Sequence, residues 1–130
     1  MTLTADALAI LRAPSICFIT TLMKDGSPQT TQTWVDTDGE HVVINTVEGY
    51  QKLRNVSRDP RVTVVVSDPE RATHYVEIRG EVVGMTTEGG AEHIERMSMK
   101  YTGGPYQNYS GRPQTRVILT IRADKVHTMG

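Results

Sequence analysis

The sequence has few of the features on which covalent catalysis, disulfide bonding or membrane insertion depend. Cys17 is the single cysteine, which excludes an internal disulfide, and its apolar neighbours Ile16 and Phe18 favour a buried thiol. No apolar run approaches the roughly eighteen residues of a membrane span, and the N-terminus lacks the basic-then-apolar pattern of a signal peptide. We therefore expect a soluble, cytoplasmic protein with no membrane partner.

The usual catalytic motifs are missing as well. The four histidines, His41, His74, His93 and His127, have no cysteine or carboxylate at ligand spacing, so we expect no metal site. Glu92, His93 and Glu95 lack a second histidine one helical turn on, and we interpret them as solvated surface. There is no Gly-x-Ser-x-Gly elbow, Walker loop or Gly-x-Gly-x-x-Gly motif after a strand. Any chemistry must therefore come from a bound molecule.

The chain has no excess of positive or negative charge, and it is short. Lysine and arginine number 14 against 15 aspartate and glutamate, a net charge of −1, so we expect no general attraction to nucleic acid. The 130 residues suffice for one core, and we expect residues 1–130 to form a single domain. Such a domain is too small to enclose a large cofactor alone.

Apolar and turn residues predict a mainly β chain with short helices, in the α+β class. Strands are expected over residues 15–22, 28–36, 41–46, 62–66, 74–86 and 116–122. The Asp-Gly pairs at residues 25–26 and 38–39 favour tight turns, so the first three strands should form an antiparallel meander. Both faces of the first strand look buried. Gly80 and Gly84 predict a bulge or bend in the fifth strand, and together the six strands indicate a small antiparallel β-barrel.

Helices are expected at three places around these strands. Thr4, flanked by Leu3 and Leu8, predicts an N-cap and a helix running to about Arg12. A second helix lies within residues 45–61, and a third opens at residues 87–88 and ends at Gly103. The apolar stripe of the second helix is Tyr50, Leu53 and Val56, and that of the third is Ala91, Ile94, Met97 and Tyr101.

The helix within residues 45–61 carries the clearest sign of a ligand. Lys52 and Arg54 stand in its early part, where free backbone N–H groups already place the positive end of the helix dipole. A bound phosphate or carboxylate would resolve this conflict. The alternative is that both cations belong to a solvated face.

Residues 102–114 show no periodicity. The segment holds three glycines, two prolines, Tyr106 and Tyr109. Connections of this length are usually either disordered or functional, so the segment is either disordered or a lid that offers aromatic contact to a ligand.

Several motifs resemble, in order and spacing, the pyridoxamine-phosphate-oxidase-like split β-barrel family, and more narrowly its flavin- and deazaflavin-dependent oxidoreductases. They are Ser15-Ile16-Cys17-Phe18-Ile19-Thr20-Thr21-Leu22, Asp25-Gly26-Ser27-Pro28-Gln29, Thr33-Trp34-Val35, Gln51-Lys52-Leu53-Arg54-Asn55, Asp59-Pro60-Arg61-Val62, Val76-Glu77-Ile78-Arg79-Gly80 and Arg116-Val117-Ile118-Leu119. The resemblance covers nearly the whole chain. It implies a six-stranded split β-barrel and a homodimer that binds coenzyme F-420 or FMN between its subunits.

The resemblance also implies a set of cofactor-binding residues. Lys52 and Asn55, with Gln51 and Arg54, would meet the cofactor phosphate; Gln32, Thr33 and Trp34, with Asn45 and Thr46, would line the ring; His74 and Tyr75 would reach it from the partner subunit. For Trp34, ordinary core packing is the alternative to ring contact.

The implied reaction is hydride transfer from the reduced cofactor to an unsaturated or electron-poor small molecule. Tyr75 or His74 is the expected catalytic proton donor. We expect coenzyme F-420, whose acidic tail suits the cations of residues 52–58, with FMN as the alternative. Oxidation of vitamin B6 is not expected, because no arginine- and histidine-bearing segment follows the last strand. A carrier of flavin, deazaflavin or haem without turnover, and a dimeric interaction module without a chromophore, are the competing interpretations.

Overall fold

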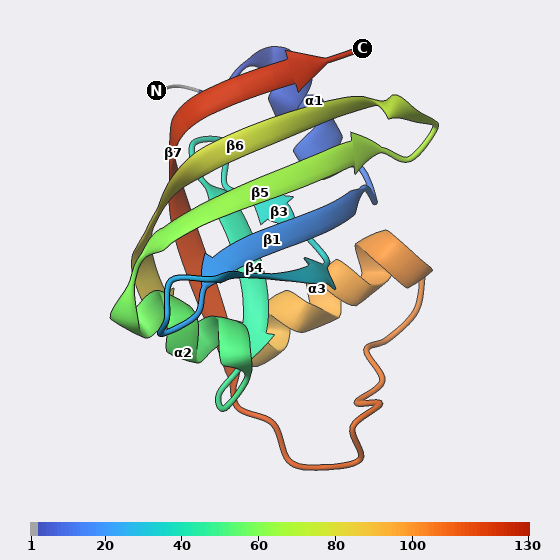
Figure 1. Cartoon of the computed structure of the whole chain (residues 1–130). Helices are drawn as coiled ribbons and strands as arrows, with labels where there is room; N and C mark the ends of the chain where they lie inside the picture. Colours follow the sequence, from blue (N-terminus) through green and yellow to red (C-terminus); the bar gives the residue numbers. More distant parts are fainter. Residues whose placement is uncertain (1–2) are drawn as a thin grey trace.

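The computed structural model describes residues 3–130, which form one curled antiparallel sheet with helices at its ends and edges (Figure 1). The elements are α1 (Ala5–Arg12), β1 (Ile16–Leu22), β2 (Pro28–Thr33), β3 (Asp36–Thr37), β4 (Val42–Val47), α2 (Gln51–Arg58), β5 (Arg61–Asp68), β6 (Arg71–Thr86), α3 (Gly90–Thr102) and β7 (Arg116–Met129). The mainly β class and the curled sheet are confirmed. The sheet has seven strands rather than the six predicted.

Helix α1 forms as predicted. The Thr4 hydroxyl accepts a hydrogen bond from the Ala7 N–H at 3.1 Å, and the helix ends at Arg12, before Pro14. Its inner face buries Ala7, together with Ile10 and Leu11, against the barrel. No helix within residues 3–130 is long and apolar enough to cross a membrane.

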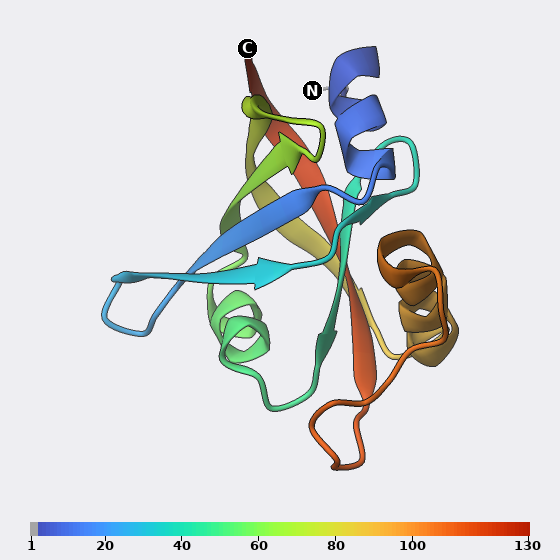
Figure 2. The ribbon, with the colours of Figure 1, turned by 90° about the vertical axis from the view of Figure 1, so that its right-hand side faces the viewer.

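The predicted meander of the first three strands is wrong. The sheet order is β2-β1-β5-β6-β7-β4-β3, so the β1–β2 and β3–β4 hairpins lie at opposite edges. The predicted strand 28–36 breaks between Thr33 and Asp36, because the Val35 N–H bonds the Tyr101 hydroxyl of α3 at 3.1 Å instead of a neighbouring strand. Figure 2 shows the two edges of the sheet diverging. The break between Thr33 and Asp36 divides the predicted strand into β2 and β3, which adds the seventh strand and leaves the barrel open between these two edge strands.

The bend predicted at the two glycines of β6 is confirmed. The β6–β7 register shifts between Arg79 and Gly80 and again between Val82 and Gly84. A Cβ at position 80 would lie 1.7 Å from the Arg122 carbonyl oxygen, so only glycine fits. Because β7 pairs with β6 from Ile118 to Met129, it is much longer than the predicted 116–122.

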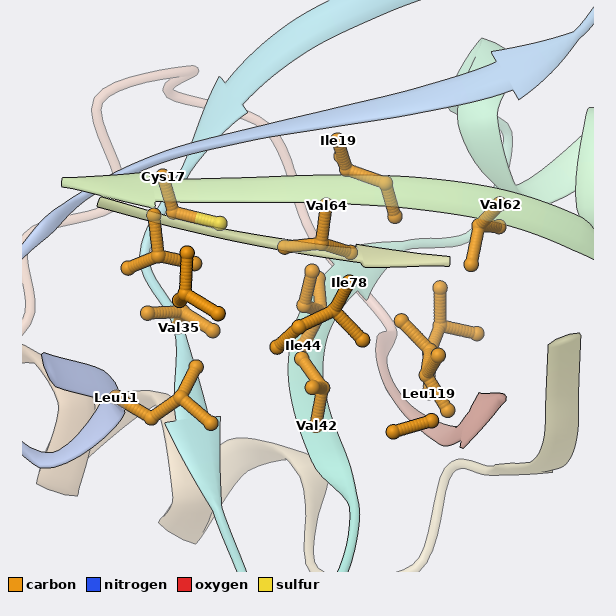
Figure 3. Packing of buried hydrophobic residues seen from close by; sticks show 14 of the residues in the cluster. Leu11, Cys17, Ile19, Val35, Val42, Ile44, Val62, Val64, Ile78 and Leu119 are labelled. Atoms are coloured by element: carbon orange, nitrogen blue, oxygen red, sulfur yellow. The ribbon is translucent and has the colours of Figure 1, made fainter. Parts of the chain in front are cut away.

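One face of the curled sheet forms the core, and the other does not. Cys17 and Ile19 of β1 point inward and pack with residues such as Val64, Ile78 and Leu119 (Figure 3). Ile16 and Phe18 alternate with them and are 46% and 43% exposed. The expectation that both faces of β1 are buried is therefore wrong, because helices cover only the inner face and the ends.

The buried faces of α2 and α3 differ from the predicted apolar stripes. In α2 the buried residues are Lys52, Asn55 and Val56, whereas Tyr50 is 44% exposed. In α3 Ala91 is exposed, and His93 is buried beside Ile94 and Met97. Polar side chains therefore point inward from both helices.

Candidate functional site

A pocket of about 460 Å³ lies at the opening of the barrel. Its walls come from the start of β1, the end of β2, β4, α3, the 102–114 loop and the start of β7. The lining residues are Pro14, Ser15, Ile16, Cys17, Gln32, Thr33, Trp34, Asn45, Ile94, Tyr101, Tyr106, Tyr109 and Arg116. The structure thus brings together four of the residues expected around a cofactor ring: Gln32, Thr33, Trp34 and Asn45. The volume is in the range of small-molecule sites.

One wall of the pocket is a rigid aromatic pair. The rings of Trp34 and Tyr101 stack with centroids 5.2 Å apart and an interplanar angle of 10°. The Tyr101 hydroxyl donates to the Ser15 carbonyl at 2.7 Å and accepts from the Val35 N–H. Burial raises the pKa of Tyr101 to about 12, so this phenol stays neutral and structural.

Lys52 does not line this pocket, but it is a buried cation without a counter-charge among residues 3–130. Its side chain is 9% exposed, and within residues 3–130 it makes no hydrogen bond or ion pair. Burial lowers the pKa of Lys52, the nearby Cys17 thiol opposes this, and repulsion from Arg116 adds to it. Because an unpaired charge is costly to bury, a bound anion at this place would stabilise the protein.

Arg116, at the start of β7, is the second cation of the site. Its guanidinium donates to neutral acceptors only: Asn45 Oδ1 at 3.4 Å, Gln114 Oε1 at 3.0 Å and the Tyr106 hydroxyl. In the part of the chain that the structure describes, its buried Nε has no partner and no carboxylate pairs with it. The sequence-based site did not include Arg116; an arginine between an aromatic loop and an apolar strand was the available signal.

The 102–114 loop makes specific contacts with this cation. The centroid of the Tyr106 ring lies 4.8 Å from the Arg116 guanidinium carbon. The backbone N–H of Tyr106 donates to Glu95 Oε2 at 3.0 Å. Gln114 Nε2 donates to the Tyr50 hydroxyl at 3.5 Å, and Tyr109 lines the pocket with 80% of its surface exposed. These contacts favour the lid interpretation over disorder.

The other predicted phosphate residues bond to one another. Arg54 Nη2 donates to Gln51 Oε1 at 2.6 Å, and Gln51 Nε2 donates to Asn55 Oδ1 at 2.8 Å. Asn55, fully buried, donates to the Thr21 hydroxyl of β1 at 2.9 Å and so anchors α2 to the barrel. No side chain caps the start of α2, so the first-turn N–H groups are not satisfied by a side chain.

The structure gives no catalytic role to two further residues, Thr46 and Cys17. Thr46 is buried inside the barrel and does not line the pocket, and its hydroxyl has no partner within residues 3–130. Cys17 lines the pocket and is fully buried, as predicted. Burial raises the pKa of Cys17 to about 12, which keeps the thiol protonated and unreactive.

His74 and Tyr75 do not line this pocket. His74 Nε2 lies 3.1 Å from Asp6 Oδ1 of α1, and Nδ1 lies 3.0 Å from the Met129 carbonyl oxygen. The Met129 carbonyl first, and Asp6 second, raise the pKa of His74, because a protonated ring donates to both. Tyr75 lies opposite Ser67, which in turn pairs with Ile16 of the pocket rim.

The interpretation of His93 as solvated surface is wrong. The side chain is 3% exposed, with Nε2 3.0 Å from Asp36 Oδ2 and Nδ1 3.0 Å from Asn45 Nδ2. The reason is the close approach of α3 to β7: a Cβ at Gly90 would lie 2.4 Å from the Arg116 carbonyl oxygen. Sequence periodicity alone does not reveal this approach.

Comparisons with known proteins agree with this fold. The family model described as pyridoxamine 5'-phosphate oxidase matches residues 3–130. A solved structure named F420 Reductase is 27% identical and aligns over 92% of this chain and 94% of its own, with a TM-score of 0.81. No curated protein matches the chain.

Two more distant structures share the fold. A Listeria innocua protein provisionally assigned as a pyridoxamine 5'-phosphate oxidase is 22% identical over 93% of both chains, with a TM-score of 0.69. A conserved hypothetical protein from Mycobacterium tuberculosis is also 22% identical, over 98% of this chain and 86% of its own, with a TM-score of 0.69.

Proposed function

Because the chain belongs to the pyridoxamine 5'-phosphate oxidase family, we propose that it is an oxidoreductase that uses reduced coenzyme F-420, a deazaflavin, to reduce an unsaturated or electron-poor small molecule. The observation that carries the proposal is the buried Lys52, which has no acidic partner within residues 3–130 and lies near enough to Arg116 of the pocket for the two charges to repel. A planar cofactor with a phosphate matches both an aromatic-walled pocket and its uncompensated positive charge. The F420 Reductase structure, at 27% identity, supports the choice of cofactor.

The residues present fit such a molecule. The phosphate would meet Lys52 and the uncapped start of α2, and Arg54 stands at the same helix end. The ring would lie along Gln32, Thr33 and Asn45, with the Trp34–Tyr101 stack fixing the wall behind it. When bound, the reduced cofactor supplies the hydride, so the chain needs only to bind, orient and exclude water.

We propose a homodimer with the cofactor at the subunit interface. On the outer face of the sheet, Ile16, Phe18 and Met129 are 46%, 43% and 44% exposed, and strand register places all three on that face. Exposed apolar patches of this kind mark interfaces. Ile16 also lines the pocket, so a partner on this face would complete the site. Light scattering of the wild type against Phe18→Asp tests this: a dimer should become a monomer.

Within this dimer, Tyr75 or His74 of the partner subunit is the proposed proton donor. Tyr75 lies on the same outer face, two strands from Ile16, so it is close to the rim that a partner would approach. His74 is held by Asp6 and the Met129 carbonyl, which leaves Tyr75 as the freer of the two. Tyr75→Phe should lower kcat while leaving cofactor affinity unchanged.

FMN is the alternative cofactor, because a single phosphate suits Lys52 equally well and the fold is that of flavin-binding oxidoreductases. Turnover separates an enzyme from a carrier. We expect the absorbance of reduced coenzyme F-420 to change with time in the presence of a quinone or nitro compound and the protein. Stoichiometric binding of the cofactor without such turnover would favour a carrier.

A further inference from the structure

A chain of buried and partly buried hydrogen bonds runs from the edge strand β3 to the pocket. Its members are Asp36 on β3, His93 on α3, Asn45 on β4 and Arg116 on β7. Four elements far apart in the sequence thus meet around one imidazole that is 3% exposed. Networks of this kind are stable only when each donor has an acceptor, so the direction of every bond can be assigned.

The direction follows from groups that can only accept. The Gly90 carbonyl oxygen lies 2.9 Å from Asn45 Nδ2, which therefore must be the amide nitrogen. The second N–H of the same nitrogen donates to His93 Nδ1, so the imidazole carries its proton on Nε2 and donates to Asp36. The Asn45 oxygen is then left to face Arg116.

Asp36 is suited to the outer end of this chain. Burial would raise the pKa of Asp36, but hydrogen bonds from His93 and the Thr37 N–H, with the positive charge of Lys100, outweigh it and lower the pKa. The carboxylate is therefore an ionised acceptor. Its side chain is 29% exposed, so water reaches it as well.

Arg116 is at the inner end and is not saturated. Asn45 Oδ1 receives its Nη1, and the acceptors of Nη2 are Gln114 and the Tyr106 hydroxyl, both from the loop side. The buried Nε has no acceptor within residues 3–130. The neutral Tyr106 hydroxyl thus stands where a stronger, anionic acceptor would bind a guanidinium.

We infer that Asp36, His93 and Asn45 are positioning residues that hold Arg116 at the pocket wall, where it binds an anionic oxygen group of the cofactor. The inference deepens the proposed function and rests on it for the identity of the ligand. Lys52 and Arg116 then form a two-cation site, and Tyr106 is the placeholder that the anion displaces. His93 acts through the Asn45 amide, not through contact with the ligand.

Two replacements of His93 separate this role from ordinary packing. In His93→Asn the amide oxygen can take the place of Nδ1 and accept from Asn45, whereas in His93→Gln the amide nitrogen takes the place of Nε2 and donates to Asp36. Fluorescence titration with coenzyme F-420 should give an affinity within about threefold of wild type for His93→Asn and at least about tenfold weaker binding for His93→Gln. The reverse order, at equal melting temperatures, would overturn the relay.

Direct replacement of the arginine is the second arm. Arg116→Gln should weaken binding of coenzyme F-420 by about tenfold or more, Arg116→Lys by less, and the matched outer-wall control Arg122→Gln not at all. Unchanged affinity in Arg116→Gln would overturn the assignment of the anion to Arg116.

A cofactor-free arm distinguishes this inference from the proposed function. Inorganic phosphate, titrated at constant ionic strength against chloride, should shift the Arg116 Nε–H resonance in a saturable way. If neither coenzyme F-420 nor FMN binds but phosphate does, the proposed function fails and the anion site stands. No saturable shift would overturn the anion site itself.

Discussion

Three arginines of the outer barrel wall differ in one respect from Arg116 in the pocket and from Lys52 near it. The three are exposed and paired with acids: Arg61 with Asp59 at 2.7 Å, Arg79 with Glu77 at 3.2 Å, and Arg122 with Glu81 at 3.1 Å and with Asp124. Lys52 and Arg116 are more buried, and within residues 3–130 no acid pairs with either. Exposed pairs contribute little to stability, whereas a buried unpaired charge is costly. The difference indicates where the protein is built to receive an anion.

Removing the Lys52 charge should have the largest effect on cofactor affinity. We expect Lys52→Ala to weaken cofactor binding by about 1–3 kcal/mol, since a charge-assisted contact is lost. Arg122→Ala on the outer wall should leave the affinity unchanged. Fluorescence titration of both variants measures this, and equal affinities for Lys52→Ala and wild type would remove Lys52 from the phosphate site.

Removal of the same charge should weaken cofactor binding but stabilise the ligand-free protein. Lys52→Met replaces a buried, unpaired ammonium by an apolar chain of similar length, so the ligand-free protein should unfold at higher denaturant concentration than wild type. A lower midpoint would mean that the Lys52 charge is already compensated in the free protein.

Asn55 is a polar residue of α2 that anchors the helix to the barrel. It is fully buried and donates to the Thr21 hydroxyl. We expect Asn55→Ala to lower the free energy of unfolding by about 1–3 kcal/mol, because buried partners are left unsatisfied. The midpoints of denaturant unfolding of Asn55→Ala and Lys52→Met should therefore shift in opposite directions from wild type. Shifts in the same direction would contradict either the structural role of Asn55 or the cost of the buried Lys52 charge.

The smallest effect is expected at His74, which does not line the pocket of its own chain. Its raised pKa means that its contribution to folding is present below the unfolded value of about 6.5 and is lost as pH rises through the folded value. Asp6→Asn should lower the pKa of His74 in an NMR titration of the ring. An unchanged pKa would contradict the Asp6 contact.

Elements with strong local signals could be predicted from the sequence. Thr4 caps α1, and Gly26 in the first Asp-Gly turn has a φ of 87°, because each depends on neighbours in the chain. A glycine inside a strand, such as Gly80, is itself a signal for a bulge, although the contact that requires it comes from Arg122 of another strand. The path of the chain between the edge strands β2 and β3 could not be predicted from local signals. It depends on the Tyr101 hydroxyl, 66 residues beyond the Val35 N–H that it captures.

The site divides in the same way. The charge anomaly at Lys52 is local, since it needs only the direction of one short helix. His93 comes to bond Asn45 of the pocket only because Gly90 lets α3 approach β7 at Arg116, and this is a tertiary event. A periodicity argument treats His93 as one more polar residue of a helix.

The central claim is that the barrel opening is built for a phosphate-bearing deazaflavin. The most direct test is a fluorescence titration of the purified protein with coenzyme F-420 and, separately, with FMN at moderate salt. We expect tight binding of coenzyme F-420 and weak binding of FMN. The reverse preference would make this an FMN protein, and binding of neither would overturn the proposed function.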